Sequence, residues 1–75
     1  MTRASTERLG NRLRVARAER GISQSDLARL AGVSRQTISS IETAEYTPSA
    51  LLAFKLAQVL DARVDGLFWL EGDDR

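Results

Sequence analysis

The stretch from Ser23 to Glu42 constrains the fold more than any other feature, because two short segments with helical apolar spacing meet there at one glycine, Gly32. Their inward positions are Leu27, Ala28 and Ala31 in the first segment and Ile38 and Ile41 in the second. Ser23 and Ser34 precede the segments as N-caps, and Gly32 suits the left-handed residue that ends a helix. The pattern predicts two short helices joined by a tight turn, a helix-turn-helix.

The outward side of the second helix carries side chains that form hydrogen bonds. They are Arg35, Gln36, Thr37, Ser39 and Ser40. A helix of this kind fits the major groove of DNA, and these side-chain types pair with base edges and phosphates. The alternative is a polar side that simply faces solvent, which the preceding turn disfavours.

Short motifs in a fixed order extend this pattern along nearly the whole chain. They are Arg14 to Arg17, Gly21-Ile22, Ser23-Gln24, Leu27-Ala28, Gly32-Val33-Ser34, Arg35-Gln36-Thr37-Ile38-Ser39, Ile41-Glu42, Tyr46-Thr47-Pro48-Ser49 and Leu56-Ala57 with Leu60. The set resembles the lambda-repressor/Cro-like (XRE-type) helix-turn-helix family over roughly residues 9–68. The resemblance implies an all-α fold, a compact bundle of about five short helices in which helices 2 and 3 form the helix-turn-helix. It also implies a single DNA-binding domain over residues 1–75, with a core at about residues 7–70 and loose termini.

The resemblance implies a role for each polar residue of the motif. Arg35 and Gln36 would contact bases, since Arg suits guanine and Gln suits adenine. The further base contacts would come from Thr37, Ser39 and Ser40. Phosphate contacts would come from Gln24, Arg17, Ser34, Tyr46 and Thr47, with backbone amides of the loop after the second helix as further donors. A partly buried ion pair between Arg17 and Glu42 would orient the base-contacting helix.

Two residues depart from the family pattern in the loop that follows this helix. Ala44 stands where relatives commonly have glycine, so a left-handed backbone there would cost about 1 kcal/mol. Glu45 stands where relatives often have a basic residue, which weakens the attraction of this loop for phosphate.

The remaining helices are expected on both sides of the motif. The expected bounds are a first helix from a cap at Ser5 or Thr6 to about residue 20, a fourth from Thr47 as N-cap and Pro48 as first helical residue to residues 61–62, and a short fifth over residues 64–68. The acidic tail from Glu71 onward is expected to be disordered.

Apolar residues in the C-terminal third exceed what one small core requires. They are Leu51, Leu52, Phe68, Trp69 and Leu70. One interpretation is that they complete the core of a single copy. The favoured interpretation is a homodimer surface, because a twofold dimer would place two base-contacting helices one turn of DNA apart, about 34 Å.

Composition excludes several classes of function. The 75 residues contain no cysteine and no histidine, so the commonest metal ligands and general bases are missing. We therefore expect no enzyme activity, no metal and no cofactor. No apolar run approaches the roughly 18 residues of a membrane span, which predicts a soluble, cytoplasmic protein without a membrane partner.

Charge is distributed unevenly although the chain carries only +1 in total. Residues 1–35 carry eight arginines and three acids, a net +5, whereas residues 36–75 carry three basic residues and seven acids, a net −4. The basic half contains the base-contacting helix, which favours a polyanion as partner. Solvated helix faces are an equally good explanation of the charge count alone.

Two functions remain at the level of the sequence. The favoured one is a transcriptional regulator that binds double-stranded DNA as a homodimer on a palindromic operator, either as a small repressor or as an autoregulatory switch. The alternative is an antitoxin or adaptor whose apolar C-terminal surface binds another protein.

Overall fold

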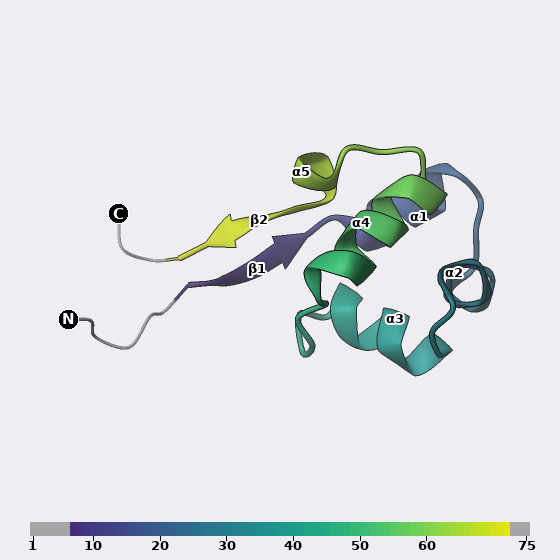
Figure 1. Ribbon diagram of the computed structural model, residues 1–75, viewed down its shortest axis with the longest axis horizontal. Helices are drawn as coiled ribbons and strands as arrows, with labels where there is room; N and C mark the ends of the chain where they lie inside the picture. Colours follow the sequence, from purple (N-terminus) through teal and green to yellow (C-terminus); the bar gives the residue numbers. More distant parts are fainter. Residues whose placement is uncertain (1–6, 73–75) are drawn as a thin grey trace.

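Five helices and a two-stranded ribbon make up the fold in the computed structural model, which describes residues 7–72. The elements in order are β1 (Arg8–Asn11), α1 (Leu13–Glu19), α2 (Gln24–Ala31), α3 (Arg35–Glu42), α4 (Ala50–Val59), α5 (Val64–Leu67) and β2 (Phe68–Glu71). Figure 1 shows the helices gathered in one body, with the ribbon of β1 and β2 extending from one side of it. The expected five helices are present, but the ribbon corrects the all-α prediction.

One cluster of buried apolar side chains holds all five helices together. Its members are Leu13, Ala16, Leu27, Ala28, Ala31, Ile38, Ile41, Leu56, Ala57, Leu60, Leu67 and Phe68. The positions predicted to face inward in α2 and α3 all belong to it. Because α2 and α3 are only eight residues each, this shared burial rather than helix propensity keeps them folded.

The first helix begins later than the sequence predicted, because residues 8–11 form a strand. β1 pairs with β2 in antiparallel register, with Leu9 opposite Leu70 and Gly10 opposite Trp69. Gly10 disfavours a helix at this point, and the Asn11 side chain accepts a hydrogen bond from Leu13 N–H at 3.0 Å, which marks the start of α1. The predicted caps at residues 5 and 6 lie outside the described residues.

The fourth helix also begins later than predicted. Ser49, not Thr47, is its N-cap, and the Ser49 hydroxyl oxygen accepts a hydrogen bond from Leu52 N–H at 3.0 Å. Pro48 is buried just before the cap instead of opening the helix. Ser is a stronger N-cap than Thr, and a start at Ser49 leaves Pro48 free to pack.

The C-terminal segment is more ordered than predicted. The short fifth helix is present, but Phe68 leaves it with an extended backbone and begins β2. Glu71, expected in a disordered tail, lies in the ribbon opposite Arg8. No helix within residues 7–72 is long and apolar enough to cross a membrane.

Candidate nucleic-acid interface

The turn between α2 and α3 has the geometry that the sequence predicted. Ser23 caps α2 by accepting a hydrogen bond from Asp26 N–H at 3.0 Å, and Ser34 caps α3 by accepting one from Thr37 N–H at 3.1 Å. Gly32 ends α2 with a left-handed backbone, φ 76°. The two caps and this glycine fix the angle at which α3 leaves α2, and α3 lies at the margin of the body in Figure 1.

An ion pair joins α1 to the C-terminal end of α3, as expected. Arg17 Nε lies 2.8 Å from Glu42 Oε2, and the two side chains are only 16% and 5% exposed. Arg17 also donates to the carbonyl of Ile22 at 2.9 Å, so the guanidinium is held from two sides. Because both charges are largely withdrawn from water, losing either partner would leave the other uncompensated.

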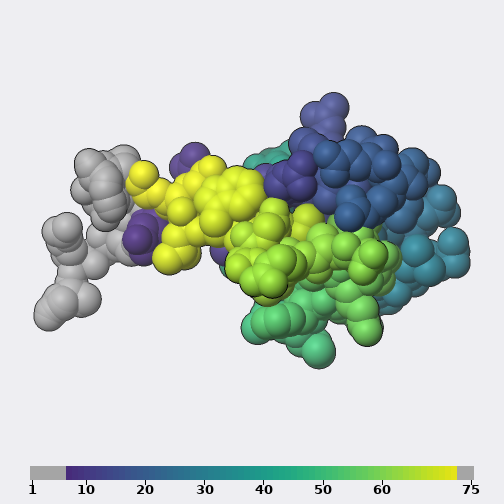
Figure 2. All heavy atoms as spheres, turned by 90° about the horizontal axis from the view of Figure 1, so that it is seen from above, coloured from purple at the N-terminus to yellow at the C-terminus, as the bar shows by residue number. Residues whose placement is uncertain are grey.

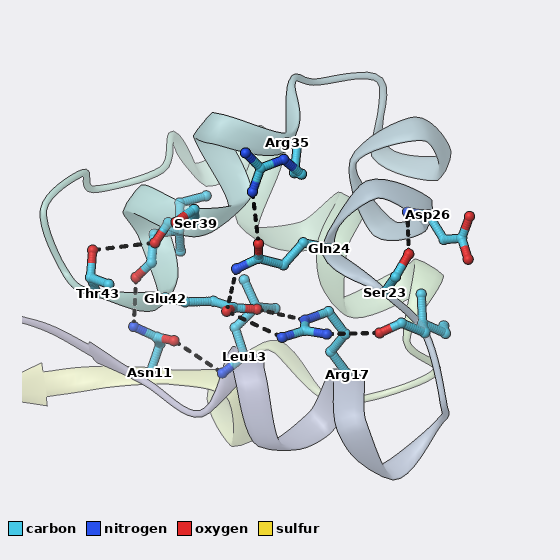
Figure 3. A network of polar contacts seen from close by, with 12 residues as sticks. Asn11, Leu13, Arg17, Ser23, Gln24, Asp26, Arg35, Ser39, Glu42 and Thr43 are labelled. Atoms are coloured by element: carbon cyan, nitrogen blue, oxygen red, sulfur yellow. Dashed lines mark hydrogen bonds and ion pairs between the residues drawn. The ribbon is translucent and has the colours of Figure 1, made fainter.

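The Gln24 side chain links the Arg17–Glu42 ion pair to the start of α3 through two hydrogen bonds (Figure 3). Its amide nitrogen donates to Glu42 Oε1 at 3.0 Å, and its amide oxygen accepts from Arg35 Nη1 at 3.2 Å. Arg17, Glu42, Gln24 and Arg35 therefore form one polar chain, which we call the α3 network. It ties both ends of α3 to the helices behind it.

Asn11 supports the same helix from the other side, and the sequence had given it no role. Its amide nitrogen donates to the carbonyl of Ile41 at 2.9 Å while its oxygen accepts from Leu13. One side chain thus starts α1 and also satisfies a carbonyl near the end of α3. The signal in the sequence was an Asn two residues before an apolar helical segment, a residue type favoured near helix starts.

The predicted base-contacting residues lie on one accessible helix, and several of them bond to one another. Arg35 and Gln36 are exposed, and Gln36 Nε2 donates to Ser40 Oγ at 3.2 Å. Thr37 Oγ1 lies 2.9 Å from Ser34 Oγ, so these two hydroxyls form a pair at the start of α3. Thr37, Ser39 and Ser40 are half-buried, so Arg35 and Gln36 are the most accessible of the five.

The loop after α3 differs in part from expectation. Ala44 has φ 64°, the left-handed backbone predicted for this position. The backbone amides of Ala44, Glu45 and Tyr46 donate to carbonyls at the end of α3, at 3.0, 2.8 and 3.1 Å. These amides therefore cap the helix and are not available to phosphate, which leaves the exposed side chains of Tyr46 and Thr47 as donors in this loop.

Most of the arginines that the structure describes form ion pairs. Within residues 7–72, Arg8, Arg12, Arg17, Arg20, Arg29 and Arg63 each have an acidic partner within 4 Å. In that part of the chain, Arg14, Arg35 and Lys55 form no ion pair. The unpaired charge nearest the candidate interface is therefore that of Arg35 at the start of α3.

The described residues contain no group of three or more acidic side chains that could hold a metal ion.

The apolar residues assigned to a dimer surface separate into two groups. Leu51, Leu70 and Trp69 are 78%, 71% and 39% exposed, whereas Leu52 is half-buried. Phe68 is only 7% exposed and belongs to the core, so its assignment to a surface was wrong. The cause is the strand that follows α5, which turns Phe68 inward.

Comparison with known proteins agrees with this geometry. The Helix-turn-helix family model matches residues 13–67. An uncharacterized HTH-type transcriptional regulator of Bacillus subtilis, YgzD, is 39% identical over 64 residues, which cover 85% of this chain and 97% of the relative. A regulator of Methanocaldococcus jannaschii with the same description is 44% identical over 64 residues, with the same coverage of both chains.

Solved structures show the same arrangement of helices. The restriction-modification controller protein C.AhdI from Aeromonas hydrophila superposes with a TM-score of 0.70 at 34% identity, over 73% of this chain and 83% of its own. SinR, a master regulator for biofilm formation solved in complex with DNA, superposes with a TM-score of 0.66 at 41% identity, over 71% and 86%. With a family match over residues 13–67 and these relatives, the chain belongs to the helix-turn-helix family of DNA-binding transcriptional regulators, a family without enzymatic activity.

Proposed function

We propose that this chain is a sequence-specific regulator in which α3 enters the major groove of a palindromic operator, with two copies bound per operator. The observation that carries the proposal is the accessible outer side of α3, with Arg35 and Gln36 exposed at its start. The α3 network fixes this side relative to the core, which is the preorganisation that a base-contacting helix requires. SinR, at 41% identity, was solved in complex with DNA.

Within this proposal, base and phosphate contacts come from different parts of the site. Arg35 and Gln36 contact base edges, with Ser40 positioned by its bond from Gln36. Gln24, Tyr46 and Thr47 contact phosphates at the flanks, and Arg17 acts mainly by positioning α3 through Glu42. These base and phosphate contacts are sufficient for a small repressor or an autoregulatory switch. The alternative of an antitoxin or adaptor finds no support among the relatives described above.

A selection of bound DNA from a random pool tests the proposal directly. The wild-type chain should enrich one inverted repeat, and Arg35→Ala should lose discrimination at one position of each half-site by about 1–3 kcal/mol. Gln36→Ala should do the same at the neighbouring position. Binding would be measured by fluorescence anisotropy on the selected duplex and on duplexes with single base changes.

Arg29→Ala is the matched control, because Arg29 is exposed on α2 and pairs with Asp26 at 3.6 Å. It should bind the selected duplex with unchanged base preference. Retention of full discrimination by both the Arg35 and the Gln36 variants would show that α3 is not the base-contacting element.

A further inference from the structure

The ribbon of β1 and β2 has two faces of different character. Opposed residues of an antiparallel pair lie on the same face, and faces alternate along each strand. One face therefore carries Arg8, Gly10, Trp69 and Glu71. Trp69 Nε1 donates to Glu71 at 3.2 Å, and both side chains lie over Gly10, within 2.7 Å of where a Cβ would stand. The space over Gly10 is therefore filled by these two side chains, while the ion pair of Arg8 and Glu71 gives this face charge.

The opposite face is largely apolar, and its outer end is exposed to solvent. Near the body, Asn11 is bonded to Ile41 and Phe68 is buried. Farther out, Leu9 is half-buried and Leu70, opposite it, is 71% exposed. An apolar strip thus leaves the core and continues to the outer part of the ribbon. Two strands of four residues are marginal by themselves in water, so covering this strip would stabilise the ribbon.

From this we infer that the ribbons of two copies pack face to face, with Leu9 and Leu70 of one copy against the same residues of the other. The inference rests on the proposed function, because it supplies the contact that joins two copies on one operator. The face carries no charged side chain among Leu9, Asn11, Phe68 and Leu70, so it offers nothing to a charged partner segment. An identical uncharged face is self-complementary about a twofold axis.

Pairing of the ribbons edge to edge is the competing arrangement. The bond from Arg12 N–H to the carbonyl of Leu67, 3.0 Å, continues the ladder of β1 and β2. Because hydrogen-bonded and non-hydrogen-bonded pairs alternate, the backbone groups of Leu70 point to the free edge of β2. A second β2 could join there only about an axis perpendicular to the sheet.

Edge pairing would turn the two α3 helices in opposite directions. In Figure 1 the strands lie side by side in the plane of the picture, with β2 on the side away from α3, and Figure 2 shows β2 in front when seen from above. A half-turn about an axis perpendicular to this plane points the second α3 away from the first. Face-to-face packing uses an axis that runs between the two ribbons, parallel to this plane and across the strands. A half-turn about that axis keeps both α3 helices on the same side of the dimer, where both can face one duplex.

Cooperative binding to DNA tests the contact. The selected inverted repeat is compared with a duplex that holds one half-site, using wild-type chain and Leu70→Glu. We expect Leu70→Glu to bind the single half-site within about twofold of wild type, to lose cooperativity, and to bind the full repeat about tenfold or more weakly. Leu70→Ser serves as a second, milder variant, and circular dichroism confirms that each variant is folded.

Phe54→Glu is the control, since Phe54 is 61% exposed on α4 and lies outside the ribbon. It should retain wild-type cooperativity. Wild-type cooperativity in both Leu70 variants would overturn the inference, as would its loss in Leu51→Glu alone. A dimer that binds two separate duplexes would show edge pairing instead.

Failure of the proposed function gives a different result. If wild-type chain binds neither the inverted repeat nor a single half-site, α3 is not a base-contacting helix, whatever the ribbon does. Sedimentation equilibrium without DNA then tests the contact on its own. Wild type should associate at high concentration while Leu70→Glu remains a monomer, and equal association of both would overturn the face-to-face contact.

Discussion

Ala44 holds a backbone conformation that disfavours any residue with a Cβ. Its φ is 64°, whereas glycine adopts this region freely. Ala44→Gly should therefore raise the free energy of unfolding by about 0.5–1 kcal/mol, after allowing for the greater freedom of glycine in the unfolded chain. Urea denaturation followed by circular dichroism measures the change.

The same substitution at Ala18 provides the contrast. Ala18 is exposed within α1, where the backbone is helical, so Ala18→Gly should lower the free energy of unfolding by about 0.5–1 kcal/mol. Opposite signs at the two positions would identify backbone strain as the cause. A loss of stability at both would mean that Ala44 makes contacts that outweigh its strain.

Glu42 is the residue on which the α3 network depends most. Its carboxylate accepts from Arg17 and from Gln24, and its side chain is 5% exposed. Glu42→Gln removes the charge but keeps the shape, and leaves the Arg17 guanidinium with a neutral partner in a poorly hydrated place. We expect the free energy of unfolding to fall by about 3 kcal/mol, measured by urea denaturation.

Asp65→Asn removes the charge from an exposed ion pair, Arg63–Asp65, and so provides the comparison with the buried Arg17–Glu42 pair. The hydrogen bond and charge of Arg63 lower the pKa of the Asp65 carboxyl, so any stabilisation from this pair is present above the ordinary pKa and is lost as the pH falls through the lowered value. Water screens the pair, and its removal should leave the unfolding midpoint unchanged. Equal effects of the two substitutions would remove the distinction between a buried and an exposed pair.

Among the elements, the ribbon depends on a residue without a side chain. A Cβ at Gly10 would stand 2.6 Å from Trp69 Nε1 and 2.6 Å from Glu71 Cδ, so Gly10→Ala must displace both side chains. The chain has one tryptophan, and its fluorescence therefore reports this displacement alone. We expect Gly10→Ala to shift the emission to longer wavelength, because the indole becomes more exposed.

Gly66 tests whether any added methyl group near the C-terminus has this effect. In α5 a Cβ at Gly66 would have its nearest neighbour at 3.9 Å, an ordinary contact. Gly66→Ala should leave the emission wavelength unchanged and stabilise the short helix slightly. An unchanged emission in Gly10→Ala would show that the indole is not packed over Gly10.

The helices could be predicted from the sequence where local chemistry defines them, and the ribbon could not. Helical spacing, serine caps and Gly32 all act within a few residues, so α2 and α3 were placed correctly. Leu9, Leu13 and Ala16 also have helical spacing, which favoured a helix where β1 lies. The residues of β2 that pair with β1 lie 57 to 63 residues away in the chain, and four residues are too few for alternation to show.

The candidate site shows the same division. The Arg17–Glu42 pair was expected from the family resemblance, and the structure contains it. The bond from Arg35 to Gln24 and the commitment of the Glu45 and Tyr46 amides depend on how α2, α3 and the loop are arranged in space. Nothing in the order of residues specifies such contacts, because each one joins groups that become neighbours only after the helices pack.

Over the whole molecule, most of the basic charge that the sequence places near α3 is already neutralised. Of the seven arginines in residues 7–35, five have acidic partners, so few unpaired cations remain for phosphates. The affinity for DNA should therefore fall only moderately with salt. If each copy neutralises about two to four phosphates, the slope of log K against log salt concentration is about −2 to −4 per copy.

Glu45 is the position at which this balance is most readily changed. It is exposed in the loop after α3, and its amide rather than its side chain caps the helix. Glu45→Lys should bring a cation beside the phosphates, tighten binding to specific and unrelated duplexes alike, and steepen the slope by about 1. Gln58→Lys, at an exposed position near the C-terminal end of α4, adds a cation away from the loop after α3 and should leave the slope nearly unchanged. Equal steepening in both variants would mean that DNA responds to the overall charge of the protein and not to the loop beside α3, and the phosphate contacts proposed for Tyr46 and Thr47 would then have to be placed elsewhere.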